Sequence, residues 1–102
     1  MARFDVYRNP NPHASHQLYL DVQSDLVSTA TRWCIPLLFA KLGYPVVSRA
    51  QGMLNLLDDS YVMDTPNLLS VPAALLRHPV GRLRSQEQSM AEASIEFMLR
   101  GY

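Results

Sequence analysis

Residues 18–23, which read LYLDVQ, alternate strictly: Leu18, Leu20 and Val22 fall on one side and more polar side chains on the other. A period of two is typical of a β-strand that buries one face. Residues 3–8 show the same alternation, and the NPNP stretch at 9–12 separates the two runs. Two prolines in that stretch remove backbone donors, so neither run can continue through it. We therefore predict two strands that pair back on each other.

Further short apolar runs follow along the chain, with turn signals between them. Five or six short strands favour a small barrel or a sandwich over a doubly wound sheet. We expect Pro36 to confine the end of the strand at 33–35 to an edge or a bulge. The other expectations are a short helical turn at 37–42, apolar runs at 44–48 and 52–57, a hairpin turn at 58–60, a return strand at 61–63, a turn at 68–69 and an extended run at 70–76.

The last segment changes to a helical period, and we predict the only long helix at about residues 86–99. Ser85 and Gln88 fit a capping box at its start, and Gly101 can end it. Two neighbouring strips of apolar residues recur at helical spacing: Ala91, Ile95, Met98 and Leu99, and beside them Met90, Ala93 and Phe97. This apolar face is wide for one small barrel. Either the barrel groove is deep or another subunit touches the helix.

Length and charge limit the class of protein. The chain has 102 residues, and we expect a single domain over residues 1–102. Nine Lys plus Arg offset nine Asp plus Glu, so the chain has no net positive charge to attract a nucleic acid. No apolar run reaches the ~20 residues that a membrane span needs, and the N-terminus lacks the apolar stretch of a secretory signal. We expect a cytoplasmic protein that binds neither membrane nor nucleic acid directly.

Candidate catalytic and metal-binding residues are few. The His and Cys residues lack paired-ligand spacing, so no metal site and no cofactor are predicted, and His13 and His16 are expected to be solvated. Cys34 lies inside an apolar strand, where a thiol is usually a small buried hydrophobe. A ribonuclease could use acid–base side chains without metal. The residues available for that chemistry are Asp25, Thr31, Arg32 and His78.

The C-terminus places an aromatic residue just beyond an apolar helix. Tyr and Arg are favoured anchors of protein interfaces, so Arg100, Gly101 and Tyr102 could form a binding tip. Chain ends also commonly fray. From the residues alone, an interface and fraying stand as equal alternatives.

The stretch at 19–27, YLDVQSDLV with its specific DVQSD core, resembles the CcdB family, the toxin half of toxin–antitoxin modules. Further matches follow in order over almost the whole length, ending with a terminal helix near Gly101. They are Phe4-x-Val6-Tyr7, Arg32-x-x-Ile35-Pro36-Leu37 and Ser70-Val71-Pro72.

The resemblance implies a mainly β fold, a small SH3-like β-barrel with one C-terminal helix, assembled as a homodimer. It implies a protein that is not an enzyme but binds the A subunit of DNA gyrase and traps gyrase on cleaved DNA, and that a CcdA-like antitoxin neutralises. In this family, contacts with gyrase come from the helix end and from two apolar residues after the Gln-Ser-Asp stretch. On this chain the corresponding positions are Leu26, Val27, Glu96, Arg100, Gly101 and Tyr102.

The resemblance is not complete at the helix tip. Well-studied gyrase poisons of the family end in an aromatic, a Gly and an aliphatic residue, whereas this chain ends in Arg100, Gly101 and Tyr102. The guanidinium of Arg100 has a flat face, as the aromatic ring does, but its charge makes it more costly to remove from water. Two alternatives therefore remain: a homologue that does not poison gyrase but binds antitoxin and regulates its operon, and a MazF-like endoribonuclease on the same barrel.

Overall fold

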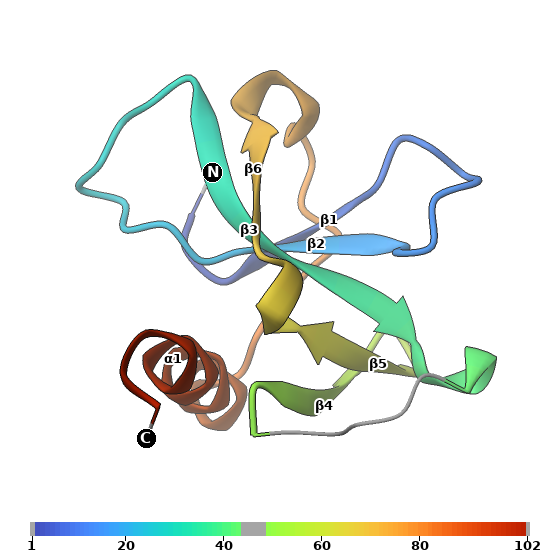
Figure 1. Cartoon of the computed structure of the whole chain (residues 1–102). Helices are drawn as coiled ribbons and strands as arrows, with labels where there is room; N and C mark the ends of the chain where they lie inside the picture. Colours follow the sequence, from blue (N-terminus) through green and yellow to red (C-terminus); the bar gives the residue numbers. More distant parts are fainter. Residues whose placement is uncertain (1, 44–48, 102) are drawn as a thin grey trace.

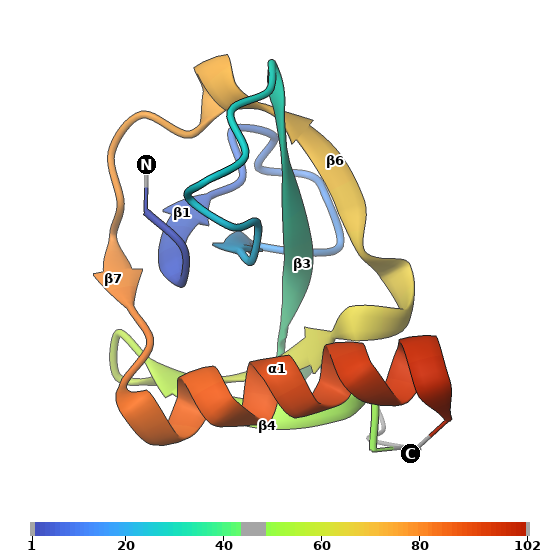
Figure 2. The ribbon, with the colours of Figure 1, turned by 90° about the vertical axis from the view of Figure 1, so that its left-hand side faces the viewer.

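The sheet is organised around one long strand, β3 (Thr31–Phe39), as seen in the computed structural model in Figure 1. The structure describes residues 2–43 and 49–101. Along one side, β3 pairs with β2 (Leu18–Asp21). Along the other, its first half pairs with β6 (Leu69–Pro72) and its last residues pair with β5 (Asp59–Asp64). Because one strand changes partner along its length, the sheet curls into a half-barrel (Figures 1 and 2).

All pairings among the described residues are antiparallel, and the strand order is β4-β5-β3-β2-β1-β7 with β6 added on β3. One helix, α1 (Ser85–Arg100), crosses the open side of the sheet next to β4 (Figure 2). The predicted fold class, a small barrel-like β fold with one C-terminal helix, is confirmed. The remaining elements are β1 (Asp5–Arg8), the short 3-10 helices η1 (Ala40–Leu42), η2 (Thr65–Asn67) and η3 (Ala73–Leu75), β4 (Gln51–Leu56) and β7 (Gly81–Arg82).

Proline does not end β3, contrary to the prediction. Pro36 lies opposite Tyr19 of β2 in the interior of the strand. On the other side of β3, β6 pairs only as far as Cys34 and β5 begins at Leu37. The missing N–H of Pro36 therefore falls where one neighbouring strand has ended and the next has not begun, so no ladder bond is lost. The helical turn expected at 37–42 is correspondingly shorter and starts at Ala40.

Turn positions also differ from the prediction. The hairpin between β4 and β5 turns at Leu57 and Asp58, both with positive φ, and Asp59 already belongs to β5. A two-residue turn of this hand matches the twist of the strands, which explains the earlier turn. The turn expected at 68–69 lies earlier, as the 3-10 helix η2, and Leu69 already belongs to β6; the extended run expected at 70–76 ends at Pro72. The apolar run at 44–48 lies outside the described residues.

Both faces of the central strands are buried. The main core lies between the sheet and α1 and receives Leu18 and Leu20, whereas Tyr19 belongs to a second cluster. That second cluster forms where β6 and the segment after it cover the outer face of the sheet, and it also holds Cys34, Tyr7, Val71 and Leu76. The alternation in β2 therefore separates two cores rather than a core and a solvent face.

Helix α1 begins one residue earlier than the expected capping box. The N-cap is Arg84, whose backbone N–H donates to Glu87 Oε1 at 3.2 Å, and Ser85 is the first helical residue. Gln88 instead donates its side-chain amide to Leu83 O at 2.9 Å. Ala91 is fully buried as predicted, but Met98 and Leu99 are exposed. The C-terminal turn of α1 therefore extends beyond the core it was expected to cover.

Candidate functional site

Two apolar residues at the predicted site lie in the loop between β2 and β3 and face solvent. Leu26 has 96% of its surface exposed, and Val27 is also exposed. Ser24 forms the turn that presents them, because its hydroxyl accepts a hydrogen bond from Leu26 N at 3.2 Å and its carbonyl one from Val27 N at 3.1 Å. Isolated exposed apolar residues are ordinary, but here a defined turn fixes the backbone that carries them.

Gln23 holds this loop closed from the inside. Its side-chain amide donates to Val27 O at 2.9 Å and to Thr29 Oγ1 at 3.0 Å, and Gln23 Oε1 accepts from Trp33 N at 3.0 Å. The residue is buried. One amide group thus connects the apex of the loop, its far end and the following strand, which limits the conformations of Leu26 and Val27.

Arg32 forms the base of the same loop through a buried, two-pronged ion pair with Asp21. Arg32 Nε lies 2.9 Å from Asp21 Oδ2, and Nη2 lies 3.0 Å from Oδ1. Nη2 also donates to Gln23 O at 3.1 Å and to Asp25 Oδ1 at 3.1 Å. Burial raises the pKa of Asp21, and the hydrogen bonds from Arg32 oppose that rise. The carboxylate therefore depends on Arg32 for its charge.

Arg3 connects the loop to the helix. Its backbone N–H lies within hydrogen-bond distance of both carboxylate oxygens of Asp25, at 3.0 and 3.2 Å, and its Nε donates to Val22 O at 2.9 Å. Its Nη1 lies 3.8 Å from Glu92 Oε1 on α1. The loop and α1 lie on the same side of the molecule in Figure 1. The loop is therefore anchored to the strand base by Arg32 and to the helix by Arg3.

The helix end carries a charged pair beside apolar side chains. Arg100 Nε lies 2.9 Å from Glu96 Oε2 one turn earlier, and both side chains are exposed. Gly101 adopts a left-handed conformation, φ 80°, and its N–H donates to Phe97 O at 2.8 Å, which ends the helix. Next to this pair, 75% of Leu99 is exposed. Tyr102 lies outside the described residues.

An apolar groove of about 520 Å³ runs between the loop and α1. Val27 lines it from the loop and Ile95 from the helix, and Trp33 of β3, more than half exposed, lies along it. The structure thus brings the predicted residue Val27 next to the helix that carries Glu96 and Arg100. The other lining residues are Arg3, Val22, Gln23, Ser24, Thr29, Thr31 and Leu68.

Of the residues considered for a ribonuclease, Asp25 and Arg32 contact each other at 3.1 Å, but His78 lies elsewhere. Arg32 is buried in its pair with Asp21, whereas Thr31 lines the apolar groove. His78 lines a different groove, against Tyr7 and Arg8. Cys34 is fully buried as predicted, and burial raises the pKa of its thiol to about 12. Among residues 2–43 and 49–101, no group of three His, Cys, Asp or Glu side chains could hold a metal ion.

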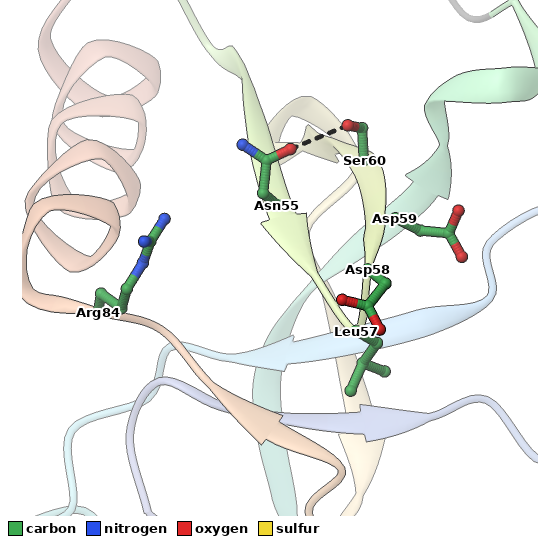
Figure 3. Close-up of a pocket in the computed structure, with 6 residues that line it drawn as sticks. All are labelled: Asn55, Leu57, Asp58, Asp59, Ser60 and Arg84. Carbon is green, nitrogen blue, oxygen red and sulfur yellow. Dashed lines mark hydrogen bonds between the residues drawn. The ribbon is translucent and has the colours of Figure 1, made fainter.

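Another concave surface is a polar hollow beside the β4–β5 turn (Figure 3). Asn55 and Ser60 face each other across the hairpin and are hydrogen-bonded at 2.9 Å, and Arg84 reaches in from the segment before α1. Asp59 pairs with Lys41 at 2.9 Å. The contacts of these residues stabilise the hairpin, and the predicted site residues that the structure describes do not line this hollow.

Sequence reasoning missed the residues that hold the site: Arg3, Asp21 and Gln23. An Asp inside an alternating apolar strand was the available signal, because a buried carboxylate requires a partner. The expectation that His16 is solvated was also wrong, since its Nε2 is buried without a hydrogen-bond partner. His16 instead packs against the Tyr19 ring, with ring centroids 5.0 Å apart. His13 is exposed as expected.

Comparison with known families gives one match, to the family described as CcdB protein, over residues 3–101. The match includes both anchors of the loop, Arg3 and Arg32, and the helix end as far as Gly101. No helix in the described part of the chain is long and apolar enough to cross a membrane.

Proposed function

The chain belongs to the CcdB family and is a toxin of the toxin–antitoxin type, and we propose that it binds the A subunit of DNA gyrase and traps gyrase on cleaved DNA. The protein binds one conformational state of gyrase better than the others and thereby increases the population of that state. On this proposal the protein breaks no bond itself and works in the cytoplasm.

The observation that supports this proposal is the pair of exposed apolar positions on a rigid frame. Leu26 is almost fully exposed although Gln23, Arg32 and Arg3 fix the loop that carries it. Leu99 is exposed at the helix end. A side chain that is already ordered loses little entropy on binding, so an apolar residue presented this way favours a protein partner. The gyrase-binding residues in this proposal are Leu26, Val27, Glu96, Arg100, Gly101 and Tyr102.

The charged pair at the end of α1 limits which gyrase surfaces can bind it. Arg100 is already paired with Glu96, so the pair enters an interface as a nearly neutral unit. Desolvating an ion pair costs less than desolvating a lone charge, but the pair still requires polar partners. A gyrase that this protein poisons should therefore offer a polar or acidic group opposite Arg100, beside an apolar surface for Leu26 and Leu99.

The remaining apolar surface supports a homodimer. Trp33, Met98 and Met90 are exposed in the single chain; Trp33 lines the apolar groove, and the two methionines lie on α1. A second copy that covers these side chains would explain why the apolar face of α1 is wider than one barrel needs. Sedimentation at micromolar concentration tests this, and a stable monomer would contradict it. A CcdA-like antitoxin is the proposed neutralising partner.

Calorimetric titration of the purified gyrase A subunit tests the binding step. We expect the double variant Leu26→Ser/Val27→Ser to lose at least about tenfold in affinity, because it removes most of the exposed apolar contact. Leu57→Asn is the control: it removes a leucine that is 43% exposed, in the β4–β5 turn, and should leave the affinity unchanged. Equal affinities for all three proteins would contradict the assignment of the loop.

One observation favours a second function. The charge at Arg100 could weaken the contact with gyrase while leaving antitoxin binding intact, which would make the protein a non-poisoning member that binds antitoxin and regulates its operon. Under that alternative, gyrase A gives no heat of binding with the wild-type protein, whereas the antitoxin encoded beside it does.

A further inference from the structure

A second groove, of about 450 Å³, lies away from α1. One wall is formed by the end of β1 and the turn after it, and the other by η3 and the segment leading to β7. The short helix η3, which follows β6, and helix α1 lie at opposite ends of the molecule in Figures 1 and 2. The lining residues are Tyr7, Arg8, Pro10, Ala74, Leu75, Arg77, His78 and Val80.

The charges of this groove are unpaired, unlike those of most of the molecule. Most cations of the described chain form ion pairs with a carboxylate. The exceptions are Arg8, Arg49 and Arg77, and Arg49 lies over the Phe97 ring at 5.0 Å. Arg8 and Arg77, the two that remain, line the same groove, together with His78. No Asp or Glu is among the described residues that line it.

The groove also offers an apolar contact of limited size. Leu75 is 46% exposed, and Leu76 directly after it is buried in the second core, which fixes the backbone of this segment. Arg77 Nε donates to Ala74 O at 3.0 Å, so one hydrogen bond restrains the exposed guanidinium against the η3 segment that carries Leu75. The arrangement is an exposed leucine with an ordered cation next to it and a second cation across the groove.

We propose that this groove docks an acidic peptide segment of a protein partner, with one aliphatic side chain on Leu75 and carboxylates on Arg8 and Arg77. Guanidinium groups bind carboxylates through paired, charge-assisted hydrogen bonds. Because the chain has no net charge, the attraction is local to this groove and not a property of the whole surface.

The surface fits a peptide better than a nucleic acid. Single-stranded nucleic acids need exposed aromatic rings for their bases to stack on, and Tyr7, the one Phe, Tyr or Trp among the described residues that line the groove, is buried. Two arginines are also few for a polyanion, which is held by many phosphate contacts.

The docking surface is independent of the proposed gyrase contacts. None of Leu26, Val27, Glu96 or Arg100 lines this groove, and the groove lies at the other end of the molecule from α1. A segment bound here would leave the loop and the helix end free, so a third protein could bind while gyrase is held. Binding at this groove therefore does not depend on whether the protein also binds gyrase.

Titration of the full-length protein with a fluorescent pentapeptide of four glutamates around one leucine tests the proposal. Amide NMR shifts should move at Arg8, Leu75 and Arg77, and the matching pentapeptide with four glutamines should bind at least about tenfold more weakly. Equal binding of the two peptides, or shifts confined to other surfaces, would overturn the proposal.

Charge-reversal variants locate the site. Arg77→Glu should weaken binding of the glutamate peptide at least about tenfold. Lys41→Glu makes the same change in net charge elsewhere and should weaken it less than about twofold. Arg77→Gln, which adds no new charge, keeps the test valid if Arg77→Glu unfolds. Equal losses for the Arg77 variants and Lys41→Glu would overturn the proposal, as would tighter binding of anionic vesicles or an oligonucleotide than of the peptide. Gyrase trapping should be unchanged in Arg77→Gln.

Discussion

Arg32 and Asp21 form a buried ion pair, with Nε–Oδ2 at 2.9 Å and Nη2–Oδ1 at 3.0 Å, at the base of the loop that presents Leu26. We expect Arg32→Met to lower the free energy of unfolding by about 3–5 kcal/mol, because it leaves a buried carboxylate unpaired. The double variant Asp21→Leu/Arg32→Met removes both charges and should recover most of that loss. Urea unfolding measures the free energies of unfolding of both variants. If Arg32→Met is no less stable than the double variant, an unpaired Asp21 is not the cause of the loss.

Gln23 should control the loop more than the overall fold. Gln23→Ala removes the acceptor of the Trp33 N–H and the donors to Val27 O and Thr29 Oγ1. We expect a loss of about 2 kcal/mol and faster hydrogen exchange at the Trp33 amide. Ser89→Ala, which removes an exposed hydrogen bond on α1, is the control and should change neither quantity by much. Unchanged protection of the Trp33 amide would show that the loop is held by other contacts.

Deletion of Gly101 and Tyr102 should separate binding from folding. Gly101 ends α1 and is exposed, so the midpoint of thermal unfolding should fall by less than about 2 °C. Growth inhibition in cells that overproduce the protein should be lost. Circular dichroism measures the first and colony counts the second. A large loss of thermal stability would show that the tip is structural.

The β4–β5 turn contains a strained residue that can be relieved. Leu57 has φ 53°, in the left-handed region that disfavours leucine, and 43% of its surface is exposed. Leu57→Asn should raise the free energy of unfolding by about 0.5–1 kcal/mol, since asparagine tolerates this region. Leu75→Asn removes an equally exposed leucine without positive φ and should bring no such gain. If both variants lose stability in urea unfolding, strain at Leu57 is not the explanation.

Stability should decrease in mild acid through His16. Burial lowers the pKa of His16, with Asp64 opposing the shift, so folding favours the neutral ring. The contribution of His16 is complete above its unfolded pKa of ~6.5 and is lost as the pH falls through the lower folded value. His16→Phe keeps a ring beside Tyr19 and should flatten the loss of stability between pH 7.5 and 5. Parallel curves for the variant and the wild type would contradict this.

The strand pattern could be predicted from sequence because it is local. Alternation at 18–23 predicted β2, and the helical period at 86–99 predicted α1 to within one residue at each end. The burial of both faces of β2 could not be predicted, since the second core forms only when β6, about fifty residues further along, pairs with β3. The same is true of Pro36, whose place in β3 depends on where β5 and β6 end.

The site was predicted only in part, for a related reason. The resemblance to the family predicted that Leu26 and Val27 contact a partner. The structure shows that both side chains are exposed. The side chains that fix them act across distance in sequence: Arg32 reaches back eleven residues to Asp21, and Arg3 reaches Asp25 and Glu92. Such contacts carry no local periodicity, so only the folded chain shows them.

Trapping of cleaved DNA tests the central claim most directly. Purified protein is incubated with gyrase, ATP and supercoiled plasmid, the reaction is stopped with detergent and protease, and linear plasmid is measured on a gel. Gyrase poisoning predicts that linear DNA accumulates with the wild-type protein and not with the Leu26→Ser/Val27→Ser variant or with the chain shortened by two residues. Wild-type protein that leaves the amount of linear plasmid at the level of gyrase alone would contradict it.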